Sequence, residues 1–475
     1  MNDTNNNTAD LPNSATADLP NSATADLPNS ATVDLPNSAT ADLPNSATAD
    51  LPNSAADEKV AEESTRVPVA IPRLSDLCVK EIAKNFQFMP ILDKIPKNYV
   101  EPLLELLETD LPLTLTVPLL EESIFWKRAC EERWSTMNYV ADYGSSWKRI
   151  YLERHLQEFL ENLDPDEYSE DQMMSVVRLC APFILRLRLC QLVHSRKMVP
   201  RRFGGKPEEG DPLSHDHINL KSCLSGLPKL EELDVVFGMR KLGLELKTEY
   251  FMFSKQDCNN IGLGMTQLES IKEVHIHRSL LDNGHLASLV QYIIFVKTLE
   301  HVDFSNCLIS DDGGMIIGQL LRVHENLKKI VLTNNKIGMD GSHFLACALT
   351  ETRCKLKLLD FRLNPIGDAG VAYLCSALAV SEVPEELNIS GCGIAEKGAK
   401  KVSRMLMYNK CLKVLNLSNN SIGEQGVEAV LLALSRNISL VQLDMRMTGL
   451  SGDQELRLSE FLKRNQGKLE ISDSF

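Results

Sequence analysis

LKVLNLSNNSI, residues 412–422, is the stretch of this chain that decides its fold. Leu412, Leu415 and Leu417 are spaced as in a short strand, and Asn420 and Ile422 follow where that strand ends. The same register begins at Leu299, Leu327, Leu356, Pro384, Leu412 and Leu440. The spacing is 28 or 29 residues throughout, and repeated units of this kind bury their apolar edge only against their neighbours. The pattern therefore predicts a stacked repeat array.

The second half of each unit predicts a helix. Glycines recur fourteen residues after the first position of the unit, at Gly313, Gly341, Gly370, Gly398 and Gly426. After the last glycine, Val427, Val430, Leu431 and Leu434 are spaced to form one apolar face of a helix. Short strands that alternate with helices at this period are typical of leucine-rich repeats, and the unit resembles the ribonuclease-inhibitor type. We therefore predict an α/β leucine-rich-repeat solenoid with a ribonuclease-inhibitor-like horseshoe architecture.

An asparagine or a cysteine after each strand predicts an internal ladder of hydrogen bonds. These residues are Asn335, Asn364, Asn420, Cys307 and Cys392. A buried side-chain amide can bond the backbone groups that a turn leaves unpaired, so asparagine suits this position. Such a ladder would join each unit to the next.

Further copies of the pattern extend the array toward the N-terminus. Units fit at Ile271 and at Leu230, and Leu187 lies in a more divergent first strand. Residues 196–220 are rich in glycine and proline and predict a surface loop within the array. We therefore place the leucine-rich-repeat domain at residues 181–475.

Residues 1–66 differ from the rest of the chain in composition. They contain six copies of an eight-residue unit, TADLPNSA with Val33 in place of alanine in the fourth copy, from Thr8 to Ala55, each with one leucine followed by a proline. So little apolar surface does not offset the entropy that is lost on ordering the chain. We predict a disordered tail without a specific role, and the alternative is a weak multivalent contact.

Charge and composition limit the partners. The formal net charge is −15, and residues 1–66, with 11 acidic and two basic residues, supply −9 of it. The remaining body lacks the concentrated basic surface that phosphate binding needs. No run of about 18 apolar residues predicts a membrane span, and the 12 cysteines are scattered singly, as in a reducing compartment. We expect a soluble intracellular protein that binds neither nucleic acid, nor membrane, nor a small-molecule substrate.

Residues 67–180 predict a small helical docking domain ahead of the repeats. This segment contains all three tryptophans, and an amphipathic helical pattern runs from Tyr151 to Leu163. Asp164-Pro165 follows the pattern and predicts the end of the helix. The simpler interpretation is that the tryptophans form the core of this domain.

A repeated Trp-Lys-Arg motif supports a second interpretation of the same segment. Trp126 and Trp147 are each followed by a lysine and an arginine. Exposed tryptophan and arginine are favoured anchors of interfaces. Under this interpretation Lys148 and Arg149 reach solvent and contact a partner, because long cationic side chains commonly extend into water.

The order of these segments resembles a known family. The stretches that carry the resemblance are LPLTLTVPLL (111–120), FWKRAC (125–130) and WKRIYLERHLQE (147–158), followed by the repeats. Together they are similar to the subunit 5 family of the dynein regulatory complex, over residues 71–475. The resemblance implies a structural subunit of the nexin link, which joins outer doublet microtubules and restrains dynein-driven sliding. It also implies other subunits of the complex and axonemal proteins as partners, in the cytoskeleton of a motile cilium or flagellum.

A different class of function is the alternative. A short helical module with Trp-Lys-Arg motifs ahead of leucine-rich repeats also loosely resembles F-box proteins, the substrate receptors of cullin ubiquitin ligases. The stretch that begins at Leu111-Pro112 lacks the compact three-helix spacing expected there. We therefore favour the axonemal interpretation.

The sequence predicts no catalytic centre and no cofactor. It contains no phosphate-binding loop, no HExxH and no paired-cysteine zinc pattern. His275 and His277 share the exposed face of a predicted strand, and Asp303 lies beside His275 on the next strand. Two imidazoles and a carboxylate can hold a metal, but solvated histidines are commoner on a repeat surface. We therefore expect no metal site.

The exposed face of the strands is the better candidate for binding a partner. Its outward positions include Asp303, Asp360 and Asp444, and Arg362 and Arg446 each follow an aspartate by two residues. One interpretation is that each Asp-x-Arg pair neutralises itself, with little stabilisation while exposed. The other is that a partner covers these charges, which then set its register and specificity.

Overall fold

The structure, a computed structural model, describes residues 73–134, 140–197, 214–240, 248–351, 353 and 355–472. These residues lie within one compact unit that runs from residue 71 to residue 475. The predicted disordered tail, residues 1–66, lies outside the described residues, and so do residues 198–213 of the predicted loop.

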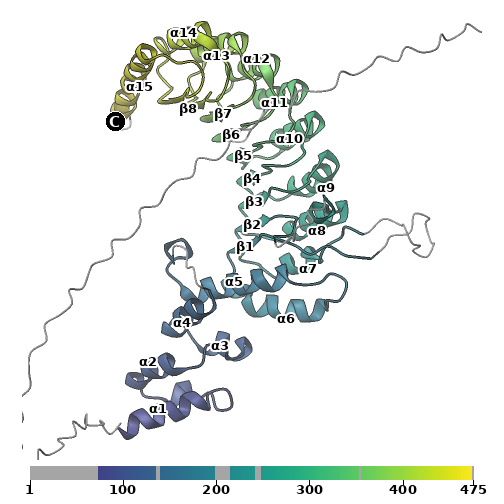
Figure 1. Ribbon diagram of the computed structural model, residues 1–475, viewed down its shortest axis with the longest axis vertical. Helices are drawn as coiled ribbons and strands as arrows, with labels where there is room; N and C mark the ends of the chain where they lie inside the picture. The colour runs from purple at the N-terminus through teal and green to yellow at the C-terminus, as the bar shows by residue number, and fades with distance from the viewer. Residues whose placement is uncertain are drawn as a thin grey trace, which may run out of the picture. The chain divides into compact units, whose positions relative to one another are not determined.

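The N-terminal part of this unit is helical (Figure 1). Its elements are α1 (Leu74–Lys84), η1 (Leu92–Lys94), α2 (Lys97–Leu106), α3 (Leu113–Leu119), α4 (Ile124–Arg133), η2 (Val140–Tyr143), α5 (Trp147–Glu161), α6 (Glu170–Cys180) and η3 (Ala181–Phe183). The predicted amphipathic helix is α5. It begins before Tyr151 because Ser146 Oγ accepts a hydrogen bond from Arg149 N (3.2 Å) and caps the helix.

The repeats begin directly after this helical part. Their elements are β1 (Arg186–Leu189), α7 (Leu220–Ser225), β2 (Glu232–Val235), η4 (Thr248–Phe251), α8 (Lys255–Met265), β3 (Glu273–Ile276), α9 (Asn283–Ile293), β4 (His301–Asp303), α10 (Asp311–Val323), β5 (Lys329–Val331), α11 (Met339–Glu351), β6 (Leu358–Asp360), α12 (Gly367–Leu378), β7 (Glu386–Asn388), α13 (Glu396–Tyr408), β8 (Val414–Asn416), α14 (Gly423–Leu434), β9 (Gln442–Asp444) and α15 (Gly452–Ser472). In the described residues the strands form one parallel sheet in sequence order, with the helices of the repeats along one side (Figure 1). This architecture confirms the predicted α/β leucine-rich-repeat solenoid.

The register of the sheet follows the sequence period. Leu359, Leu387 and Leu415 hold the same position in consecutive units and lie side by side in β6, β7 and β8. All three are buried, as is Leu417 at 0 % exposure. Because every unit contributes the same apolar positions, one continuous core runs from the helical part through the repeats.

The asparagine and cysteine positions form the predicted ladder. Asn420 Nδ2 donates to Ile389 O (2.9 Å), and its Oδ1 accepts from Cys392 N (3.0 Å) and Ile394 N (3.1 Å) in the preceding unit. Cys392 holds the same position and directs its Sγ toward Phe361 O (3.2 Å). Each ladder residue therefore joins two neighbouring repeats through backbone groups that the turn leaves free.

The recurring glycines allow an aspartate to cap the helix of the next repeat. Asp311 Oδ1, at the start of α10, accepts from Gly338 N (2.7 Å) and Gly341 N (2.8 Å) at the start of α11. A Cβ atom on Gly341 would lie only 2.8 Å from this oxygen. Asp368 caps α13 in the same way, at 2.8 and 2.9 Å.

Helix α5 covers the first strand of the sheet. Glu153 Oε1 accepts hydrogen bonds from Leu185 N (3.0 Å) and Arg186 N (3.1 Å), and Glu161 Oε1 accepts from Cys190 N (2.7 Å). These carboxylates supply acceptors for backbone N–H groups that lack a preceding strand. The helical part is therefore packed against the repeats, and its predicted boundary at residues 180 and 181 lies between α6 and β1.

Helix α15 covers the last strand. Asn465, which is fully buried, donates from Nδ2 to Leu440 O (2.7 Å), and Gln466 Nε2 donates to Val441 O (3.0 Å). Across the described residues, every helix falls short of the length or the apolar content that a bilayer span requires.

Candidate partner-binding face of the sheet

The strand face opposite the repeat helices is the candidate site. We call it the open face and define it as the strand positions that alternate with the buried leucines, isoleucines and valines. In β4, for example, His301 and Asp303 lie on the open face and flank the buried Val302. Among the described residues, the helices of the repeats lie along the other side of the sheet and leave these polar side chains uncovered (Figure 1).

Ion pairs dominate the open face over the first strands. Glu232 on β2 pairs with Arg186 (3.2 Å) and with Arg188 (2.8 Å), both on β1. Asp234 is also on β2, and its Oδ1 lies 2.9 Å from Nε2 of His277, which follows β3. This end of the face is therefore charged but largely neutralised within itself.

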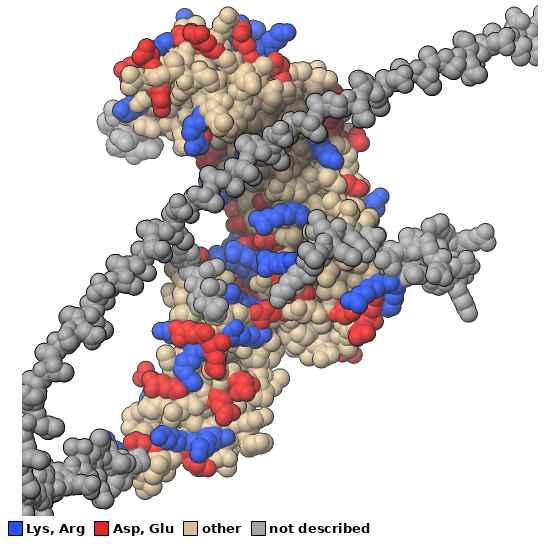
Figure 2. Space-filling view, in the orientation of Figure 1, with Lys and Arg blue, Asp and Glu red and all other residues tan. Residues whose placement is uncertain are grey.

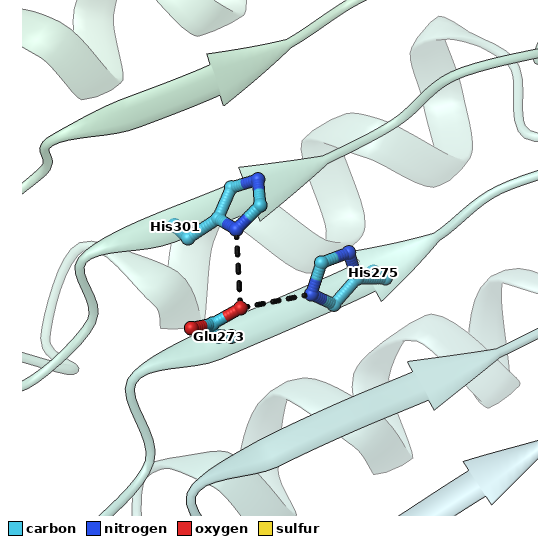
Figure 3. Close-up of side chains that lie close together, drawn as sticks. All are labelled: Glu273, His275 and His301. Atoms are coloured by element: carbon cyan, nitrogen blue, oxygen red, sulfur yellow. Dashed lines mark hydrogen bonds and ion pairs between the residues drawn. The ribbon is translucent and has the colours of Figure 1, made fainter. Parts of the chain in front are cut away.

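A histidine–carboxylate cluster follows on β3 and β4 (Figure 3). Glu273 Oε2 lies 3.2 Å from His301 Nδ1 and 3.5 Å from His275 Nε2, and His275 Nδ1 lies 3.7 Å from Asp303 Oδ2. The histidine side chains are 16 % and 17 % exposed and that of Glu273 is 47 % exposed. The cluster is thus half-buried and faces the open side of the sheet.

The pKa values of the two histidines of this cluster are shifted in opposite directions. Burial disfavours the charged form of His275 and by itself lowers the pKa. The hydrogen bond and charge of Asp303, together with the charges of Asp234 and Glu232, outweigh burial, so the pKa of His275 is raised. Burial and the charge of His275 together lower the pKa of His301. The pKa of Asp303 is lowered because its bonds to His275 and Ser305 outweigh its burial.

The structure brings a different set of residues together around His275 from the set expected from the sequence. His275 and Asp303 are register partners, as expected, but His277 is engaged by Asp234 instead. Glu273 and His301 join the cluster, and the sequence reasoning missed both. The repeat period contained the signal, since residues 28 apart lie side by side and His301 follows Glu273 by that distance.

Farther along the sheet, the two Asp-x-Arg pairs behave differently. Arg446 forms two-pronged hydrogen bonds to Asp444, with Nη2–Oδ2 at 2.6 Å, although its side chain is 84 % exposed. Asp360 instead accepts from Arg362 N (2.9 Å) and from Asn388 Nδ2 (3.1 Å). Among the described residues, the exposed guanidinium of Arg362 forms no ion pair. Of these two Asp-x-Arg pairs, only Asp444 and Arg446 neutralise each other's charge.

The expectation that Lys148 and Arg149 reach solvent is wrong. Lys148 is buried, and its Nζ donates to Val117 O (2.8 Å) and Leu120 O (2.7 Å) at the end of α3. Arg149 Nε lies 2.8 Å from Glu153 Oε1, with its side chain only 15 % exposed. Burial lowers the pKa of Lys148, although Glu122 and Glu121 oppose this. Lys148 therefore joins α5 to α3, Arg149 pairs within α5, and neither cation offers a docking surface.

On the face shown in Figure 2, acidic and basic side chains are interspersed over the helical part and the repeats. Such a surface favours specific pairing of charges with a partner over general attraction of one sign.

Comparison with known proteins agrees with this architecture. The family model described as leucine-rich repeat matches residues 297–318, 353–375 and 408–431. Dynein regulatory complex subunit 5 of Mus musculus is 30 % identical over 260 residues, which are 54 % of this chain and 52 % of that protein. The protein of the same name from Chlamydomonas reinhardtii is 28 % identical over 216 residues, or 46 % and 50 % of the two chains.

A second group of relatives shares the repeats. The ribonuclease inhibitor of Mus musculus is 25 % identical over 221 residues, which cover 40 % of this chain and 48 % of the inhibitor. The chain spans about half the length of each of these three relatives. It is an α/β leucine-rich-repeat protein whose homologues in mammals and in Chlamydomonas reinhardtii are named dynein regulatory complex subunit 5.

Proposed function

We propose that this chain is a non-catalytic structural subunit of the nexin–dynein regulatory complex. In this role it is a protein–protein scaffold that links outer doublets and regulates dynein-driven sliding in motile cilia and flagella. The observation that carries the proposal is the set of homologues named for that complex in mammals and in an alga, together with the leucine-rich-repeat fold. The proposed location is the axoneme, and the proposed partners are other subunits of the complex and axonemal proteins.

The open face is the proposed partner surface. Its candidate contacts are Asp303, Asp360, Arg362, Asp444 and Arg446. Of these, Arg362 is the clearest, since it is exposed and forms no ion pair among the described residues. Asp444 and Arg446 also line a groove of about 610 Å³ at the C-terminal end of the sheet. Charges distributed along the sheet, on or just after β4, β6 and β9, suit an elongated partner whose own charges set its register.

The F-box-like alternative gains no support from the homologues described above. We therefore propose the axonemal function alone.

Charge reversal on the open face tests the proposal. Arg362→Glu should fold normally and reduce recovery of the tagged chain in salt-washed axonemes, because a partner's complementary charge is then repelled. Arg436→Glu is the matched control, since Arg436 is also exposed but follows α14 on the helix side of the sheet. The experiment uses ciliated cells that lack the endogenous protein, with circular dichroism to verify folding.

Two outcomes would count against the proposal. A chain that is absent from axonemes altogether would remove the axonemal function. If Arg362→Glu is incorporated as well as the parent chain, and if crosslinks to neighbouring proteins lie outside the open face, the axonemal function stands. The open face is then not its partner surface.

A further inference from the structure

The cluster on β3 and β4 has the donor atoms of a metal site. Glu273 offers a carboxylate oxygen, and His275 and His301 each offer an imidazole nitrogen. These three atoms lie within 4.8 Å of one another. Two imidazoles and one carboxylate form a donor set that zinc and other borderline divalent metals accept, with a further position left for water or another ligand.

The separations between donors fit a tetrahedral ion. Zinc bonds nitrogen and oxygen at about 2.0–2.1 Å, so two donors of a tetrahedral site lie about 3.3 Å apart. Glu273 Oε2 is 3.2 Å from His301 Nδ1 and 3.5 Å from His275 Nε2. Two of the three edges are already close to the required length. The third, between the two imidazole nitrogens, lies within 4.8 Å, and rotation of the histidine rings can shorten it.

The surroundings of His275 support the same inference. Within the described residues, His275 Nε2 is buried and makes no hydrogen bond of normal geometry, and its contact with Glu273 Oε2 is a long one at 3.5 Å. The opposite ring nitrogen, Nδ1, lies 3.7 Å from Asp303 Oδ2. A metal-binding histidine commonly donates its other ring N–H to a carboxylate, because that hydrogen bond fixes the tautomer and orients the ring.

We propose that Glu273, His275 and His301 bind one Zn²⁺ ion on the open face, with Asp303 orienting His275. This site goes beyond the proposed scaffold function. It would join β3 to β4 and thereby lock two neighbouring repeats together. The fourth position would face the open side of the sheet, where a water molecule or a partner's side chain completes the coordination.

A metal-free explanation of the cluster makes a different prediction. Protonated histidines and carboxylates can form the same contacts as ion pairs alone, and they would then have no preference for a metal. Zinc titration separates the two explanations, because one equivalent of Zn²⁺ binds through these residues only if they form a metal site.

The experiment measures zinc binding to the purified full-length chain after treatment with a chelator. We expect one equivalent of Zn²⁺ by calorimetry and a rise of the thermal midpoint on binding. Glu273→Gln and His301→Gln should each weaken binding at least tenfold and remove the thermal shift, and Asp303→Asn should weaken it by about tenfold. Substituted Co²⁺ should give the intense visible absorption of a tetrahedral site without thiolate charge-transfer bands.

His277→Gln is the matched control. His277 follows the same strand and has nearly the same side-chain exposure as His275, 15 % against 16 %, but it contacts Asp234. It should bind zinc as the parent does. The proposal is overturned if the parent binds no stoichiometric metal, if both Glu273→Gln and His301→Gln bind like the parent, or if cobalt shows thiolate bands.

Discussion

Both Trp-Lys-Arg motifs place a cation on the carboxyl end of an earlier helix. Arg128 Nη1 donates to Leu104 O (3.0 Å) and Leu107 O (3.1 Å) at the end of α2, and Lys148 does the same for α3. The last carbonyls of a helix lack partners within it, and the helix dipole favours a positive charge there. The two motifs therefore contribute to the assembly of the helical part from short helices.

Charge reversal at Lys148 tests this role at the scale of one residue. Lys148→Glu should lower the free energy of unfolding by roughly 3 kcal/mol or more, because a carboxylate would face two carbonyl oxygens in a buried site. Lys127→Glu is the control, since Lys127 is 44 % exposed and lies 3.8 Å from Glu131. Urea unfolding of the purified variants measures both effects, and equal stabilities would contradict the assigned role.

His155 gives a prediction about pH. Burial, with the charge of Arg133, lowers the pKa of His155 from 6.5 to about 4. As pH falls from about 6.5 to 4, the unfolded chain therefore takes up a proton that the folded chain does not, and stability falls. The thermal midpoint of the parent should drop more steeply over this range than that of His155→Gln. Parallel curves for the two proteins would show that His155 does not titrate in this way.

At the scale of elements, the capping aspartates connect successive helices. Asp368→Ala should destabilise the protein by about 1 kcal/mol, because Ala395 N and Gly398 N at the start of α13 lose their acceptor. Asp340→Ala is a suitable comparison, since Asp340 is exposed in the first turn of α11. Chemical unfolding should show little change for the comparison variant. A similar loss in both would assign the effect to helix charge and not to the cap.

The sequence predicted those elements that repeat and missed contacts that occur once. The strands, ladder asparagines and outer helices recur with one period, so each unit reinforces the interpretation of the others. The burial of Lys148 depends on Val117 and Leu120, which only the fold brings to it, and an exposed cation was the natural expectation. The pairing of Glu273 with His301 is predictable only in part. The repeat period places the two residues side by side but does not show that their side chains meet.

At the scale of the whole molecule, stability depends on contacts between neighbouring repeats. Leu417→Asp places a charge in the strand core, where it has no partner, and should cost roughly 4 kcal/mol or more. Because each repeat is held by its neighbours, the damage should spread to the adjacent units. Leu432→Asp is the same change on α14 at a side chain that is 59 % exposed, and it should shift stability by about 0.5 kcal/mol or less. Calorimetric unfolding that is unchanged in Leu417→Asp would contradict the register of the sheet.

The covering of β9 by α15 has a consequence for how such an array can change over evolution. Asn465 and Gln466 occupy backbone carbonyls next to the last strand, where another strand would otherwise add. A gene duplication can therefore insert a new unit between the ends more easily than after them. Each inserted unit would move every contact beyond it by one strand spacing, about 4.8 Å. Distances between partners along the open face can thus evolve only by multiples of this strand spacing.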